Sequence, residues 1–90
     1  MRLVWRARAR ADLRGIIDYI SDRNRNAADT LQDSIARTIE FLTVNPFMYR
    51  SGRMPDTREA VINPNYVIVY RVAKDSVVIL AVLHARQNYP

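Results

Sequence analysis

The chain has 90 residues, 49% of them hydrophobic and 26% charged, which is the balance of one soluble globular domain spanning 1–90 rather than of a disordered segment. It contains no cysteine, so disulfides, thiolate metal sites and cysteine nucleophiles are excluded. The N-terminal stretch is charged and no long apolar run follows, which predicts a cytoplasmic protein that is not bound to a membrane. The net charge of +5 predicts that the partner is an acidic protein or a nucleic acid.

Arginine dominates the basic residues, because 13 of the 14 are Arg and Lys74 is the only lysine. Guanidinium groups recognise carboxylates and phosphates in bidentate geometry, so this composition favours specific docking of an anionic partner. A codon preference for Arg would give the same composition. Five arginines near the N-terminus give a local excess of positive charge where an acidic partner could dock, and the alternative interpretation is a solvated helix face: Arg2, Arg6, Arg8, Arg10 and Arg14.

Two helices are expected in the first half of the chain. Apolar residues at helical spacing predict a first helix over 8–22, preceded by a short strand at 3–5. Gly15 within that helix is interpreted as a point of close packing against another element. A second helix is predicted from Asn26, its expected N-cap, to Asn45, where the next residue is proline. The two helices would form an αα-hairpin.

The second half of the chain predicts a sheet. Residues 45–56 lack periodicity and predict an ordered loop, and three strand-like runs separated by turn residues follow at 58–62, 66–72 and 77–83. The last two runs are apolar on nearly both faces, which favours interior strands with material packed on each side. The predicted class is α+β, in the order β-α-α-β-β-β, with the hairpin packed on one face of an antiparallel sheet that the first strand joins.

Several phrases, in this order, cover almost the whole chain: VWRARARADL, IIDYI, NP after the second helix, GR in the loop, RE opening the sheet, YVIVYRV and VILAVLHARQ. Together they resemble the ParE/RelE toxin superfamily of type II toxin–antitoxin systems. The resemblance implies a toxin that is wrapped and neutralised by an antitoxin encoded by the neighbouring gene. The chain has no room for a cofactor domain and only one histidine, so neither a cofactor nor a metal is expected.

The superfamily implies two activities, which are mRNA cleavage on the ribosome in RelE-like members and poisoning of DNA gyrase in ParE-like members. The nucleases typically have R-x-x-Y in the central strand, but Val67 stands three residues before Tyr70. The phrase LHARQ resembles the V-L-H-x-x-R end of ParE-like chains, although Arg86 follows His84 by two residues instead of three. The resemblance is closer to ParE, the plasmid stabilisation protein, and implies a gyrase inhibitor with a ParD-like antitoxin; the alternative is a RelE-like mRNA endonuclease.

The favoured prediction is a binding protein and assigns no catalytic residue. RNA cleavage would need a base, an acid and cations beside the phosphate. The residues available for that alternative are His84, Arg86, Arg71 and Arg58. Two of these residues also have a structural interpretation instead of a catalytic one. His84 would form a structural hydrogen bond on the strand face that it shares with Val78, Leu80 and Val82. Arg71 would form an ion pair with Glu59 on a neighbouring strand.

Partner contacts are expected where arginines alternate with aromatic and apolar residues ahead of the sheet, and at the C-terminal end. The predicted partner-binding residues are Arg50, Arg53, Arg58, Arg86 and Tyr89. The alternative for this loop is that at least one of Phe47 and Met48 packs into the core.

Overall fold

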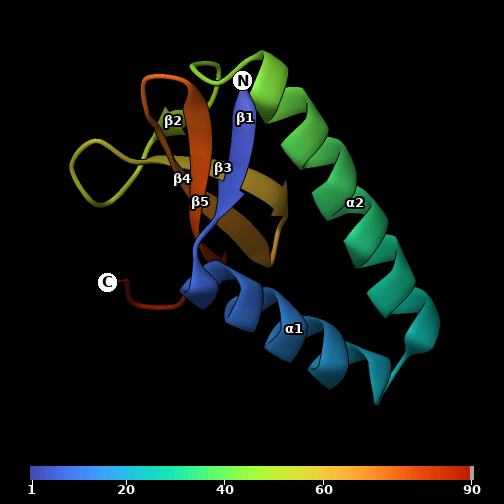
Figure 1. Ribbon diagram of the computed structural model, residues 1–90. Coiled ribbons are helices and arrows are strands. Elements are labelled where there is room, and N and C mark those ends of the chain that lie inside the picture. The colour runs from blue at the N-terminus through green and yellow to red at the C-terminus, as the bar shows by residue number, and fades with distance from the viewer. Residues whose placement is uncertain (90) are drawn as a thin grey trace.

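The structure, a computed structural model that describes residues 1–89, places two helices against a five-stranded sheet (Figure 1). The elements are β1 (Arg2–Trp5), α1 (Ala7–Ser21), α2 (Arg25–Val44), β2 (Arg50–Ser51), β3 (Arg58–Asn63), β4 (Tyr66–Val72) and β5 (Ser76–His84). The predicted α+β class and αα-hairpin are confirmed, and the tip of the hairpin projects away from the sheet in Figure 1. Within residues 1–89, no helix is both long and apolar enough to span a bilayer.

The sheet is mixed, with the strand order β1-β5-β4-β3-β2. Strands β2 to β5 pair antiparallel, whereas β1 lies at the edge and pairs with β5 in parallel, with Leu3 opposite Val77. This departs from the predicted antiparallel sheet because no hairpin turn joins β1 to β5, so nothing local sets their relative direction. A second departure is β2, a two-residue strand within the segment predicted to be loop.

The second helix begins earlier than the sequence pattern predicted. Asn24, not Asn26, is the N-cap of α2: its backbone is extended and its side-chain oxygen accepts the N–H of Ala27 at 3.0 Å. The N–H of Asn24 also donates to the carbonyl of Ile20 at 2.7 Å, at the end of α1. Both asparagines can cap a helix, and the short connection between the helices selects the earlier one.

Each face of the two central strands has its own core cluster. On the helix side, the buried residues are Ala9, Leu31, Ile35, Leu42, Ala60, Ile68, Tyr70, Val77 and Ile79. On the other side, the buried cluster is Val67, Val69, Ala81 and Leu83, with Leu80 and Tyr89 packed against it. The expectation that both faces of these strands are covered is therefore confirmed.

A β-bulge at Leu80 changes which side chains of β5 share a face. Val69 lies opposite Ala81 but Tyr70 lies opposite Ile79, so Leu80 is the extra residue between the two pairs. The alternation of β5 is reversed beyond this point. Val78 and Val82 consequently lie on opposite faces, and the predicted common face of these residues with His84 is wrong. His84, opposite Tyr66, lies on the helix side of the sheet.

Gly15 is exposed on α1 and does not mark a close approach. A β-carbon built at this residue has nothing within 4 Å, so the predicted packing role is wrong. Replacing Gly15 with Ala should therefore raise the free energy of unfolding by about 1 kcal/mol, because Ala restricts the unfolded chain and favours the helix. Urea denaturation of both proteins measures this difference. A destabilised G15A variant would contradict the open surroundings of this position.

Candidate functional site

A buried carboxylate organises the segment ahead of the sheet. The Glu59 side chain, on β3, is contacted by the Arg50 guanidinium at 3.3 Å and by Nε of Arg53 at 3.1 Å, and it accepts the backbone N–H of Arg53 at 3.0 Å. The predicted pairing of Glu59 with Arg71 is therefore wrong. The reason is β2, which was not predicted and which places Arg50 directly opposite Glu59 in the sheet.

Arg53 also holds the C-terminal segment that follows β5. Its two terminal nitrogens donate to the backbone carbonyls of Gln87 at 2.6 Å and Ala85 at 3.2 Å. Tyr89, farther along this segment, packs against the outer core cluster, and the guanidinium of Arg8 lies 5.0 Å from its ring centre. The fold thus connects two predicted partner-binding residues, Arg53 and Tyr89, through one segment.

Arg58, at the start of β3, supports the segment that links α2 to β2. Its guanidinium donates to the backbone carbonyls of Tyr49 at 2.7 Å and Phe47 at 3.3 Å. The side chains of Phe47 and Met48 are 65% and 71% exposed, so the alternative in which one of them packs into the core is wrong. The partly buried Tyr49 contacts the core instead.

Tyr70, on β4, holds the same segment through its hydroxyl, which donates to the carbonyl of Pro46 at 2.6 Å. Burial raises the pKa of this hydroxyl, the charge of Arg58 lowers it and Tyr49 raises it, with a net upward shift. A raised pKa in the folded state means that this contribution to stability is present below the unfolded pKa of about 10 and is lost as the pH rises above it.

Replacing Tyr70 with Phe should therefore cost about 1 kcal/mol of stability at neutral pH, because one buried hydrogen bond is lost. Above a pH of about 10 the wild type should lose stability more steeply than the variant, because its tyrosine hydroxyl ionises in the unfolded chain while the raised pKa keeps it protonated in the folded protein. Denaturation curves on both sides of that pH measure the difference. Parallel losses in the two proteins would show that Tyr70 does not contribute to the alkaline transition.

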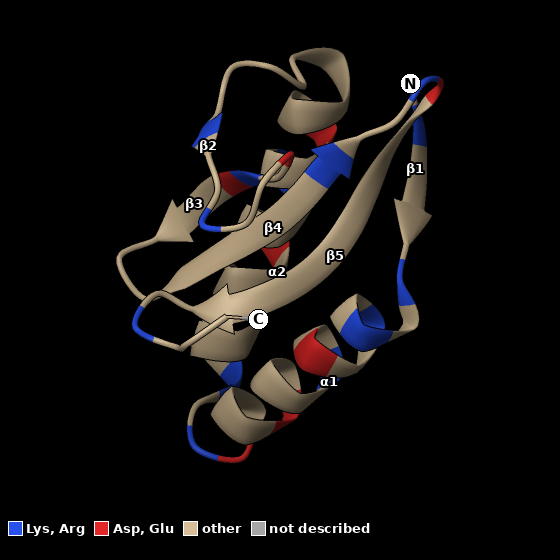
Figure 2. Cartoon of the chain, turned by 90° about the vertical axis from the view of Figure 1, so that its left-hand side faces the viewer, with Lys and Arg blue, Asp and Glu red and all other residues tan. Residues whose placement is uncertain are grey.

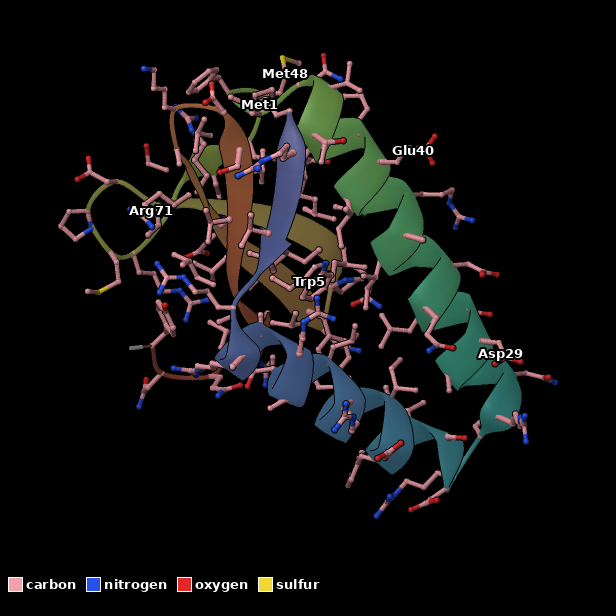
Figure 3. The ribbon with its side chains drawn as sticks, viewed as in Figure 1. Met1, Trp5, Asp29, Glu40, Met48 and Arg71 are labelled. Carbon is pink, nitrogen blue, oxygen red and sulfur yellow. The ribbon has the colours of Figure 1, made fainter. Side chains whose placement is uncertain are left out.

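An open groove of about 830 Å³ lies between the loop over 51–57 and the end of β4. Its charged lining residues are Arg53, Arg58, Arg71 and Asp56, and its apolar ones are Phe47, Met54, Pro55 and Val72. Figure 2 shows basic segments at β2, on the following loop and at the end of β4. In Figure 3, Arg71 lies beside that loop. Positive charge and apolar surface are thus combined in one concave region.

The residues considered for RNA cleavage are not brought together. His84 pairs with Tyr66 at one end of β4, and its Nδ1 accepts the backbone N–H of Arg86 at 3.2 Å. Arg71 lies five residues farther along β4, roughly 16 Å at about 3.3 Å per residue, and on the opposite face by strand alternation. Arg58 lines the groove near Arg71. The four candidates therefore form two separate pairs.

Asp12 has a structural role that the sequence analysis did not identify. Its carboxylate accepts the backbone N–H of Val82 at 3.1 Å and lies 3.4 Å from Nε of Arg8. β1 ends at Trp5, opposite Ile79. Among residues 1–89, no strand lies beside the edge of β5 beyond Ile79, and α1 covers that edge instead. A carboxylate among five arginines was the available signal, but the sequence does not show which edge it faces.

Comparisons with known proteins agree with this architecture. A family profile described as the ParE toxin of type II toxin–antitoxin system, parDE, matches residues 3–89. Y4kP of Sinorhizobium fredii, named as a candidate toxin, is 37% identical over 90 residues, which is 99% of this chain and 93% of that protein. Toxin RelE2 of Caulobacter vibrioides is 36% identical over 86 residues, which is 93% of this chain and 94% of that protein.

A solved structure is similar in fold. A chain in the structure of the chromosomal ParDE toxin–antitoxin system from P. aeruginosa superposes with a TM-score of 0.80 and 23% identity, covering 93% of this chain and 95% of that chain. At this level of identity the likeness concerns the fold alone. The profile match and the two relatives establish the family, and the chain belongs to the ParE toxins of type II toxin–antitoxin systems, within the ParE/RelE superfamily.

Proposed function

We propose that this toxin acts by binding proteins: it inhibits DNA gyrase, as the ParE-like resemblance implies, and a cognate ParD-like antitoxin neutralises it. Membership of a toxin–antitoxin family implies the antitoxin partner. The observation that carries the proposal is the separation of His84 and Arg86 from Arg58 and Arg71. A base and the cations that stabilise the phosphate must reach the same group within about 3 Å. A separation of roughly 16 Å along β4 does not provide that arrangement.

The predicted partner-binding residues divide into two roles on this proposal. Arg53 and Arg58 donate to backbone carbonyls of the chain itself and position the loop and the C-terminal segment. Arg50 and Arg86 are exposed and are available to carboxylates of a partner. Tyr89 packs against the outer face of the sheet and keeps the segment that carries Arg86 in place.

The test is inducible expression in bacteria with and without the neighbouring gene, followed by separate measurements of DNA replication and translation. We expect replication to stop first, with DNA-damage signalling, and the neighbouring gene to rescue growth. With purified components, the chain should inhibit supercoiling by gyrase, and the neighbouring gene product should restore it. Early loss of translation with cut mRNA, while replication continues, would contradict the proposal.

The second candidate is a RelE-like, ribosome-dependent mRNA endonuclease, and two observations favour it. One relative is named Toxin RelE2, and the groove collects three guanidinium groups that suit a phosphate. The candidate residues for that reaction are His84 and Arg86 with Arg58 or Arg71. On this alternative, His84→Ala abolishes mRNA cleavage while the fold stays intact. A wild-type protein that leaves mRNA uncut on translating ribosomes would end it.

A further inference from the structure

The arginines that line the groove differ in how far their donors are already used. Arg53 forms an ion pair with Glu59 through Nε and donates through both terminal nitrogens to the C-terminal segment. Arg58 donates to two backbone carbonyls. The guanidinium of Arg71, a half-buried residue, forms no hydrogen bond or ion pair with any group among residues 1–89. The groove therefore presents one guanidinium whose donors are uncommitted.

The charges around Arg71 favour an anion. Among residues 1–89, the groove is lined by one carboxylate, that of the exposed Asp56, and by three guanidinium groups. Glu59, the acidic residue of β3, already pairs with Arg50 and Arg53. An incoming carboxylate would thus meet an excess of positive charge and a fork of free donors, which is the geometry for a bidentate pair.

The loop that forms one wall of the groove is shaped by its own backbone. The N–H of Gly52 donates to the carbonyl of Thr57 at 2.7 Å, and the Thr57 hydroxyl donates to the carbonyl of Met54 at 2.7 Å. A β-carbon at Gly52 would collide with Thr57, and Asp56 has a positive φ of 62°. A wall that is already ordered reduces the entropy lost when a partner docks.

We propose that this groove binds an acidic segment of a protein partner, with Arg71 as the anchor for an aspartate or glutamate carboxylate. This inference rests on the proposed function, because it assumes a toxin that works through protein contacts. Phe47, Met54 and Val72 supply apolar walls beside the charge, a mixture typical of protein interfaces. A single uncommitted guanidinium suits one carboxylate better than a nucleic acid, whose affinity depends on many phosphate contacts.

The first experiment titrates the isotopically labelled full chain with a short blocked peptide of glutamate and leucine residues, followed by NMR. We expect shifts to concentrate at residues 51–58 and 71–72 and at Nε of Arg71. Arg71→Gln should weaken binding of the peptide about tenfold or more, since a charge-assisted bidentate pair is lost. Arg37→Gln is the matched control, because it removes the same charge from an exposed position on α2. It should change the affinity less than about twofold.

Three outcomes would overturn this assignment. Equal weakening by Arg71→Gln and Arg37→Gln would show attraction to the whole basic surface rather than a site. No localised shifts with the peptide would show that the groove does not bind acidic peptide. A uridylate oligonucleotide of equal charge that perturbs the same residues and displaces the peptide would make the groove a nucleic-acid site.

A supercoiling assay on the same proteins separates this inference from the proposed function. If the wild type inhibits gyrase but the peptide does not bind the groove, the groove assignment fails alone. If the peptide binds at Arg71 but the wild type has no effect on gyrase, the target assignment fails and the groove stands as a site for another acidic protein.

Discussion

Replacing Arg53 with methionine is expected to lower the free energy of unfolding by about 3 kcal/mol, because the buried Glu59 carboxylate loses its closest guanidinium. Methionine keeps much of the apolar part of the arginine side chain, so the lost stability comes from the removed charge and not from reduced side-chain volume. The C-terminal segment should also become mobile, since Arg53 supplies two of its hydrogen bonds, at Ala85 and Gln87. Urea denaturation gives the first quantity, and hydrogen exchange at residues 85–89 gives the second.

Arg50→Met is the matched control for this variant. Arg50 contacts the same carboxylate, but its side chain is 62% exposed and rehydrates when the pair is broken, so a loss of at most about 1 kcal/mol is expected. The double variant Arg53→Met/Glu59→Gln should recover part of the loss, because it removes the buried charge that Arg53 no longer compensates. Equal losses for Arg50→Met and Arg53→Met would contradict the burial of Glu59.

Leu42→Ala on α2 is the second change with a large expected effect, a loss of about 3 kcal/mol from removed apolar burial and the cavity left behind. Leu42 is fully buried in the cluster between the helices and the sheet. Val44→Ala, two residues later in the same helix, is the control: Val44 is 76% exposed, so its truncation should change stability by no more than about 0.5 kcal/mol. Thermal and urea denaturation of both variants measure the contrast. Similar losses would mean that the end of α2 is not packed as the structure has it.

Much of the fold could be predicted because its signals are local. The bounds of β4, Tyr66–Val72, match the predicted strand, since an apolar run is bounded on each side by turn residues. α1 and α2 follow their apolar spacing to within one or two residues. The cap of α2 was harder, because Asn24 and Asn26 have the same capping chemistry and only the path of the chain distinguishes them.

The contacts among the predicted site residues were not predicted from the sequence. Arg50, Arg53 and Arg58 were identified from charge beside aromatic residues, and the structure brings them together around β2 and the start of β3. Their roles as partner contacts stay predictions. The ion-pair partner of Glu59 was wrong because a two-residue strand such as β2 has no period that a sequence can show.

The class, the number of helices and the two central strands could be predicted from the sequence, because helix and strand periodicity and turn residues act within a few neighbours along the chain. The family was indicated separately, by the resemblance of phrases along the whole chain. Only the tertiary structure decided the parallel pairing of β1, the bulge at Leu80 and the separation of His84 from Arg71. These depend on which distant segments share a sheet and on a one-residue shift of register, and such a shift moves every later side chain to the other face. Whether a set of catalytic candidates converges is therefore decided by register between strands and not by the residues alone.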